Sequence, residues 1–164
     1  FGTFADVSPG WHTVVVEYFE SGGYARIHVW AETTVLTSST WSGEYFANRD
    51  LQDPAAFYRD ANTIDFDWGN GSPDDSKLNP DFFSVRWKRT LPMTFGNYKF
   101  FVETKKDDWV RVKVDGWTVI EDFREDGGRI ESDFANMGGG DVTIIVEYQE
   151  HGGRAGIKFW WEKQ

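Results

Sequence analysis

The sequence has no cysteine among its 164 residues, and it has only three histidines. Without cysteine, disulfide bonds and thiolate metal sites are impossible. The histidines, His12, His28 and His151, do not have the spacing of a zinc site, which argues against zinc. No apolar run approaches the ~20 residues that a membrane-spanning helix needs, so we expect no membrane insertion.

Basic residues are also scarce. Lys and Arg number 17 against 27 Asp and Glu, which gives a net charge of −10. This excess of negative charge argues against nucleic acid and anionic membrane surfaces as partners. The sequence lacks Gly-x-Ser-x-Gly, His-Glu-x-x-His and phosphate-loop motifs, and no carboxylate pair stands out as acid and base. We therefore expect a non-catalytic protein in an extracellular or cell-surface setting.

Aromatic residues and glycine are abundant, with nine Trp, fourteen Phe and seventeen Gly. Apolar and polar residues alternate with a period of two, and no segment has helical periodicity. Strands are predicted at 43–46, 56–59, 63–68, 83–88, 98–104, 110–114, 117–123 and 130–134. With a final pair of strands, this predicts an all-β fold of two packed antiparallel sheets, a β-sandwich. The residues predicted to face inward are Phe66, Trp87, Phe100, Val112, Val114 and Val146.

One stretch occurs twice, at 14–32 and at 144–162, at a constant offset of 130. The first copy matches the second at Val16, Glu17, Tyr18, Glu20, Gly22, Gly23, Ala25, Ile27, Trp30 and Glu32. A self-match at a fixed offset is typical of repeat proteins. Each copy is predicted to be a β-hairpin, because alternating residues flank a turn that contains two glycines.

The repeat suggests a division of the chain into three parts. Residues 1–32 form a terminal hairpin equivalent to the end of a preceding repeat, 33–40 form a linker, and 41–164 form a complete repeat. A lone hairpin is marginally stable in water, and this one exposes apolar residues such as Val14 and Ile27. We predict that it packs on a neighbouring copy, so that copies associate head to tail.

Five motifs resemble the PA14 domain in their order and spacing. They are WSGEYFANRDL, IDFDWGNGSPD, FFSVRWKRTL, DDWVRVKVDGWTVIEDF and VEYQEHGGRAGIKFWWE, and they span Trp41 to Glu162. The resemblance implies a barrel-like β-sandwich in a secreted or cell-surface protein. Its members occur in adhesins, flocculins, toxins, glycosidases and bacterial surface proteins. Some bind glycans through calcium, and others are spacers.

The resemblance also implies a candidate calcium site. The calcium lectins of the family use two successive aspartates before a strand, and Asp107 and Asp108 stand at that position. The candidate second loop comprises Glu150, His151, Gly152 and Gly153. Sugar-binding members usually offer Asn or Asp where this chain has His151 and glycine, and Trp109 replaces a glycine. The alternative is that the aspartates only shape a β-corner through local hydrogen bonds.

Two other features have a chemical and a structural interpretation. Asp65 and Asp67 resemble the start of an EF-hand loop, but Ser76 stands where the bidentate Glu is required. Exposed aromatic residues either stack on sugars or pack against neighbouring elements. The candidates are Trp30, Trp109, Trp117 and Trp161.

The primary hypothesis is a structural or adhesion module, a repeat unit of a tandem array or fibre. One alternative is a calcium-dependent glycan-binding module. Another is an accessory domain of a secreted glycosidase or protease. The expected partners are neighbouring copies of the repeat and glycans, and calcium is the one candidate cofactor.

Overall fold

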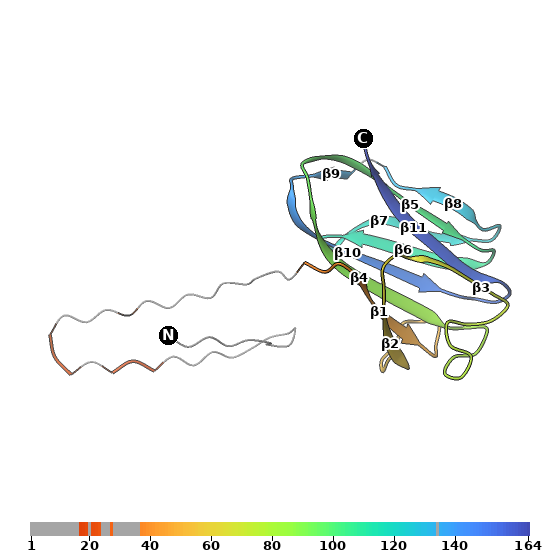
Figure 1. Ribbon diagram of the computed structural model, residues 1–164, viewed down its shortest axis with the longest axis horizontal. Coiled ribbons are helices and arrows are strands. Elements are labelled where there is room, and N and C mark those ends of the chain that lie inside the picture. The colour runs from red at the N-terminus through yellow and green to blue at the C-terminus, as the bar shows by residue number, and fades with distance from the viewer. Residues whose placement is uncertain (1–16, 20, 24–26, 28–36, 134) are drawn as a thin grey trace. The chain divides into compact units, whose positions relative to one another are not determined.

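The computed structural model describes residues 17–19, 21–23, 27, 37–133 and 135–164 (Figure 1). The chain divides into two units, Phe1–Thr34 and Val35–Gln164, and the strands described here belong to the second. Most of the predicted hairpin at 14–32 and half of the linker at 33–40 lie outside the described residues. Their structure therefore stays a prediction.

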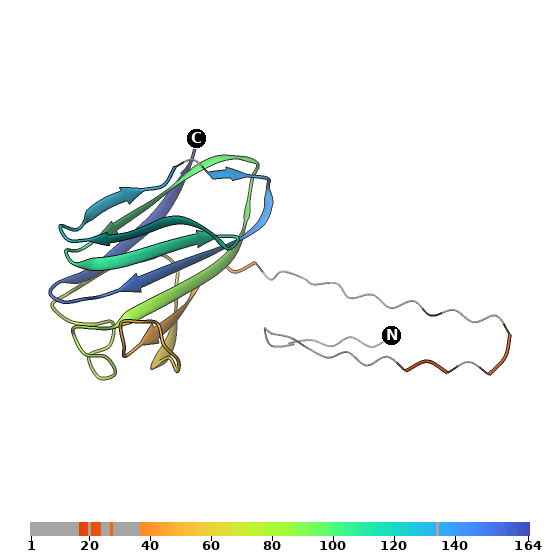
Figure 2. The same ribbon diagram turned by 180° about the vertical axis from the view of Figure 1, so that it is seen from behind.

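The second unit is a sandwich of two antiparallel sheets that face each other in both views (Figures 1 and 2). The larger sheet has the order β2-β1-β4-β10-β6-β7 and the smaller one the order β3-β11-β5-β8, with β9 also paired to β5. The strands are β1 (Trp41–Phe46), β2 (Phe57–Ala61), β3 (Asp65–Gly69), β4 (Ser84–Met93), β5 (Gly96–Thr104), β6 (Asp108–Val114), β7 (Trp117–Arg124), β8 (Gly128–Glu131), β9 (Ala135–Met137), β10 (Gly140–Gln149) and β11 (Ala155–Lys163). This confirms the predicted all-β sandwich. Among the described residues, no helix is long and apolar enough to cross a membrane.

The prediction that residues 144–162 form a hairpin is wrong. β10 lies between β4 and β6 in the larger sheet, whereas β11 lies between β3 and β5 in the smaller one. Residues 150–154, which we call the crossing turn, carry the chain from one sheet to the other. A hairpin and a crossing between sheets have the same local pattern, in which alternating residues flank a Gly-Gly turn. The local sequence therefore cannot specify which strand each of the two will pair with.

The predicted core is confirmed, with one residue at its edge. Trp87, Phe100, Val112 and Val146 have no exposed surface, and Val114 is 3% exposed. Phe66 is partly buried and packs against the core; its ring stacks on those of Trp68 and Trp87 at centroid distances of 5.2 and 5.6 Å.

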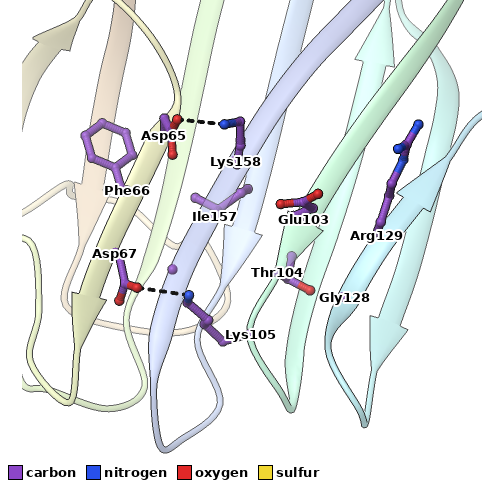
Figure 3. A pocket seen from close by; sticks show the side chains of 11 residues that line it. Asp65, Phe66, Asp67, Glu103, Thr104, Lys105, Gly128, Arg129, Ile157 and Lys158 are labelled. Carbon is purple, nitrogen blue, oxygen red and sulfur yellow. Dashed lines mark hydrogen bonds and ion pairs between the residues drawn. The ribbon is translucent and has the colours of Figure 1, made fainter.

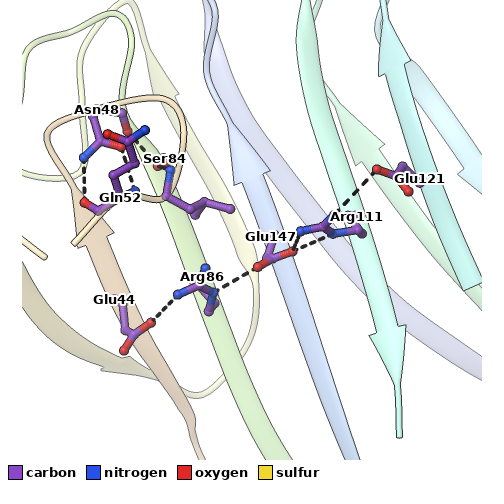
Figure 4. A network of polar contacts seen from close by, with 9 residues as sticks. Glu44, Asn48, Gln52, Ser84, Arg86, Arg111, Glu121 and Glu147 are labelled. Atoms are coloured by element: carbon purple, nitrogen blue, oxygen red, sulfur yellow. Dashed lines mark hydrogen bonds and ion pairs between the residues drawn. The ribbon is translucent and has the colours of Figure 1, made fainter. Parts of the chain in front are cut away.

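A row of charged residues crosses the outer face of the larger sheet (Figure 4). Glu44, Arg86, Glu147, Arg111 and Glu121 stand opposite one another on β1, β4, β10, β6 and β7. Glu147 accepts hydrogen bonds from Arg86 Nε at 3.0 Å and Arg111 Nε at 2.7 Å. Burial opposes ionisation of Glu147, but the two arginines outweigh it and lower its pKa. A one-residue slip of any of these strands would break the row, so it helps to fix the register.

Val112→Ala tests the inward phase of β6. The substitution leaves a cavity beneath the sheet and should reduce the free energy of unfolding by about 1–3 kcal/mol. Thr118→Ala, on the exposed side of β7, is the matched control and should change it by less than ~0.5 kcal/mol. Urea unfolding followed by fluorescence gives both values. Equal effects of the two substitutions would mean that the side chains of β6 face the other way.

Candidate functional site

Two loops predicted from the sequence meet at one end of the sandwich. They are the β5–β6 loop and the crossing turn. Between them lies a hollow of about 390 Å³, and its walls are formed by Lys105, Lys106, Asp107, Gly152, Gly153 and Arg154. The structure thus brings Asp107 together with Gly152 and Gly153 of the candidate second loop.

The two aspartates have different environments. Asp107 is half-exposed and lines the hollow, with a positive φ of 64° and its N–H bonded to the carbonyl of Arg124 at 2.7 Å. Asp108 is the first residue of β6 and is fully buried. Successive residues of a strand point to opposite faces, and Asp108 falls on the inner face with Val110 and Val112.

The carboxyl group of Asp108 lies between the two sheets. The hydroxyl of Tyr148 donates to Asp108 Oδ2 at 2.8 Å, and the N–H of Gly156 donates to the same hydroxyl at 3.1 Å. Within the described part of the chain, no donor has hydrogen-bond geometry to the buried Asp108 Oδ1, although the backbone N–H groups of His151 and Lys105 are close enough to lower the pKa of this carboxyl group. Burial raises the pKa of Asp108 to about 7; the bond from Tyr148 lowers it, and the negative charge of Glu150 raises it further.

Glu150 is a second buried carboxyl group, and it holds the crossing turn. Its Oε2 accepts the N–H of Phe82 at 2.8 Å, and its Oε1 accepts the N–H of Gly152 at 2.6 Å. Burial raises the pKa of Glu150, although these two bonds oppose the rise. His151 packs on the ring of Phe123 with centroids 5.3 Å apart. Glu150 and His151 therefore do not line the hollow, and both support the turn.

The described donor atoms bear on the calcium site that the resemblance implies. Calcium takes six to eight oxygen ligands at about 2.3–2.6 Å. Among the described residues there is no group of three or more His, Asp or Glu side chains that could hold a metal ion. The orphaned Oδ1 of Asp108 is the one feature that favours a cation, but it lies in the interior, and Lys105, Lys106 and Arg154 stand on the walls of the hollow. Calcium at this pair stays a prediction, and the donor set weighs against it.

A second hollow, of about 430 Å³, involves the smaller sheet (Figure 3). Asp65 pairs with Lys158 at 3.1 Å, and Asp67 pairs with Lys105 at 3.0 Å. The hydrogen bond from Lys105 lowers the pKa of Asp67. The two aspartates that resemble an EF-hand are thus neutralised by separate lysines instead of converging on one point.

The aromatic candidates differ in their accessibility. Trp109 is half-buried, with the guanidinium of Arg111 5.1 Å above its ring. Trp161 is half-buried against Phe159, with ring centroids 5.9 Å apart. Trp117 is 80% exposed, and Trp30 lies outside the described residues. Trp117 is therefore the most accessible of the three that can be compared.

Sequence reasoning missed Tyr148, which binds Asp108. The alternation of β10 marks Tyr148 as inward-facing, but nothing local to it indicates that its hydroxyl reaches a carboxyl group on β6. Only the pairing of β10 with β6, in which Tyr148 stands opposite Val110, brings it near Asp108.

Comparisons with known proteins agree with this fold. The family model described as PA14 domain matches residues 36–163. Anti-sigma-I factor RsgI3 of Acetivibrio thermocellus is 35% identical over 130 residues, which are 78% of this chain and 20% of the relative. An anti-sigma factor domain-containing protein from Clostridium clariflavum has a similar structure, with a TM-score of 0.67 and 26% identity over 82% of this chain and 48% of that one.

A third similar structure is described as the PA14 sugar-binding domain from an RTX adhesin. Its TM-score is 0.64 at 18% identity, and the match covers 77% of this chain and 90% of that one. At this identity the likeness concerns the fold alone. The chain thus spans about a fifth of its curated relative and about half of the Clostridium clariflavum protein.

The buried carboxyl of Asp108 predicts a specific dependence of stability on pH. Its pKa is about 7 in the folded state, against an ordinary 3.8, so the folded state holds this proton more tightly. Stability from this group is therefore present at low pH and is lost as the pH rises toward 7. The pKa of Glu150 is also raised. Its contribution to stability is therefore also lost as the pH rises.

Asp108→Asn removes the ionisable group and keeps an acceptor for Tyr148. The decrease in unfolding free energy between about pH 5 and 8 should be smaller in the variant by roughly 2 kcal/mol. Urea unfolding of both proteins at the two pH values measures this difference. Identical pH profiles would show that Asp108 is ionised in the folded protein at both.

Proposed function

Because the chain belongs to the PA14 domain family, we propose that it is a non-catalytic, extracellular module that binds glycans for a longer surface protein. Two similar proteins are much longer than the part that this chain matches, and the module would thus work as one domain among others. Attachment to a polysaccharide is consistent with both an adhesion role and a sensing role.

The non-catalytic assignment rests on the burial of Asp108. A general acid at neutral pH needs a carboxyl group with a raised pKa that can reach the ligand. Asp108 has such a pKa, but it is fully buried and bonded to Tyr148. Asp65 and Asp67, at the second hollow, are paired with lysines. This supports binding without chemistry.

Glycans are the ligand class with the best support. The excess of acidic residues disfavours polyanions such as nucleic acids, while a polar surface with an accessible tryptophan suits sugars. The adhesin domain described as sugar-binding shares this fold. The donor set at Asp107 favours binding that does not need calcium.

The internal repeat supports a second element of the proposal, an array of copies. Residues 14–32 match a segment that supplies an interior strand to each sheet of the described domain. We propose that successive copies associate head to tail, with neighbouring copies of the repeat as partners.

Affinity electrophoresis tests the proposed function. The protein should migrate more slowly in gels that contain a soluble plant or bacterial polysaccharide than in plain gels. Migration should be the same with 2 mM calcium or with EDTA, because the carboxylates near Asp107 do not make a complete calcium shell. The same polysaccharides should release no reducing ends on incubation.

Three results would contradict the proposal. Release of reducing ends would make the protein an enzyme, and retardation by no polysaccharide would make it a spacer. Retardation that requires calcium, together with a calcium-dependent rise in melting temperature that Asp107→Ala abolishes, would restore the calcium-lectin alternative.

Light scattering tests the array. Association of copies through residues 1–32 predicts that the mass of the 164-residue chain rises with protein concentration, while a chain that begins at Ser39 stays monomeric. A monomeric full chain at all concentrations would contradict the head-to-tail association.

A further inference from the structure

The end of the sandwich opposite the Asp107 hollow also has features of a binding site. β6 runs from Asp108 to Val114, so its two ends are about 20 Å apart at ~3.3 Å per residue. At the far end lies a hollow of about 320 Å³. Its lining comprises Val114, Asp115, Trp117, Val119, Ala135, Asn136, Met137, Gly138, Gly139, Asp141 and Val142.

We propose that this hollow binds a sugar unit of a neutral polysaccharide, with Trp117 as its stacking platform. The proposal rests on the proposed glycan-binding function, and it adds the site and the ligand class. We call this hollow the Trp117 site.

Trp117 is held at the rim of the hollow by the backbone around it. Asp115 and Gly116 both have positive φ, 47° and 84°, as the two central residues of a type I′ hairpin turn require. Trp117 therefore begins β7 directly opposite Val114. Val114 is buried, but Trp117, one strand nearer the sheet edge, is 80% exposed.

An indole on a surface is common and alone implies nothing. Trp117 differs from an isolated surface tryptophan because it lines a hollow whose lining also contains polar side chains. Aromatic side chains combine a large apolar face with little conformational freedom, which makes them effective anchors in binding sites. The apolar face of a sugar ring matches such a surface, and its hydroxyl groups then need polar partners in the hollow.

The polar partners at the Trp117 site are already fixed in position. One carboxylate oxygen of Asp115 accepts the N–H of Thr143 at 2.8 Å, and the N–H of Asp115 donates to the carbonyl of Thr143 at 2.8 Å. The amide of Asn136 donates to Asn97 Oδ1 at 2.9 Å. Groups that are held before the ligand arrives lose less entropy on binding.

The charge of the lining selects among sugars. The Trp117 site contains two carboxylates, Asp115 and Asp141, and its lining includes neither lysine nor arginine. An acidic sugar would meet only negative charge there, and the net charge of −10 adds to the repulsion. Hydroxyl groups of a neutral sugar can donate to both carboxylates. The structure thus favours neutral glycans over uronates.

The size of the hollow fits one unit of a polymer. Pockets that enclose whole small ligands measure about 300–1,000 Å³, and this hollow is near the lower limit. A single sugar ring would occupy it while the rest of the chain remains outside. Affinity for a long polysaccharide would then come from many equivalent units along it.

Titration calorimetry with cellohexaose, xylohexaose and mannohexaose tests the Trp117 site. At least one of these should bind the full chain, and Trp117→Ala should weaken that binding about tenfold, as expected for the loss of one aromatic contact. Asp141→Ala should weaken it by a smaller factor. Because Trp117 is mostly exposed, the melting temperature should be unchanged.

Tyr58→Ala is the matched control. Tyr58 is 69% exposed on β2, at the other edge of the larger sheet from β7, so its loss should leave affinity unchanged. Oligogalacturonate of the same length is the control for charge and should show no binding that depends on Trp117.

The outcomes separate the site from the function. If a hexaose binds and Trp117→Ala binds it equally well, or if only Asp107→Ala weakens it, the Trp117 site is wrong and the glycan-binding function stands. If oligogalacturonate binds in a manner that depends on Trp117, the neutral class is wrong. If no polysaccharide or oligosaccharide binds the unmodified protein, both proposals are wrong.

Discussion

The hydroxyl group of Tyr148 joins the two sheets next to the crossing turn, where the chain passes from β10 to β11. It donates to Asp108 on β6 of the larger sheet and accepts from Gly156 on β11 of the smaller sheet. Gly156 must be glycine for β11 to lie this close to β3, since a Cβ there would lie 2.9 Å from the carbonyl oxygen of Phe66. Glu150 holds the turn itself. These contacts support the turn between an interior strand of the larger sheet, β10, and an interior strand of the smaller sheet, β11.

This arrangement decides what the Asp107 end of the molecule can do. Asp108 and Glu150 serve the junction between the sheets, so their carboxyl groups are withdrawn from the surface where a ligand would bind. Asp107 remains in the hollow, with three cationic side chains on the same walls. At the other end, where the chain crosses between the sheets from β4 to β5 and from β9 to β10, Trp117 is exposed and the lining of the hollow contains carboxylates but neither lysine nor arginine.

Much of the fold could be predicted from the sequence, because alternation reports directly on which side chains are buried. Val112, Val114 and Trp87 were identified in this way. The hairpin prediction failed because strand pairing between β10, β6 and β4 depends on contacts distant in the sequence. The site was predictable only in part. The family pattern located Asp107 and Asp108, but the inward phase of β6 sets which of them is buried. In the sequence, Trp109, Trp117 and Trp161 were equal candidates for exposed aromatic residues, and only the place of Trp117 on the edge strand β7 distinguishes it from the other two.

The central claim is that ligand binds at the end of the sandwich that carries Trp117. A titration of ¹⁵N-labelled protein with a neutral hexasaccharide, followed by amide chemical shifts, tests it directly. The claim predicts the largest shifts at Asp115–Trp117 and at Gly138–Asp141, together with the indole N–H of Trp117. Shifts concentrated at Lys105–Asp108 and Gly152–Arg154 would contradict it and would assign recognition to the Asp107 hollow.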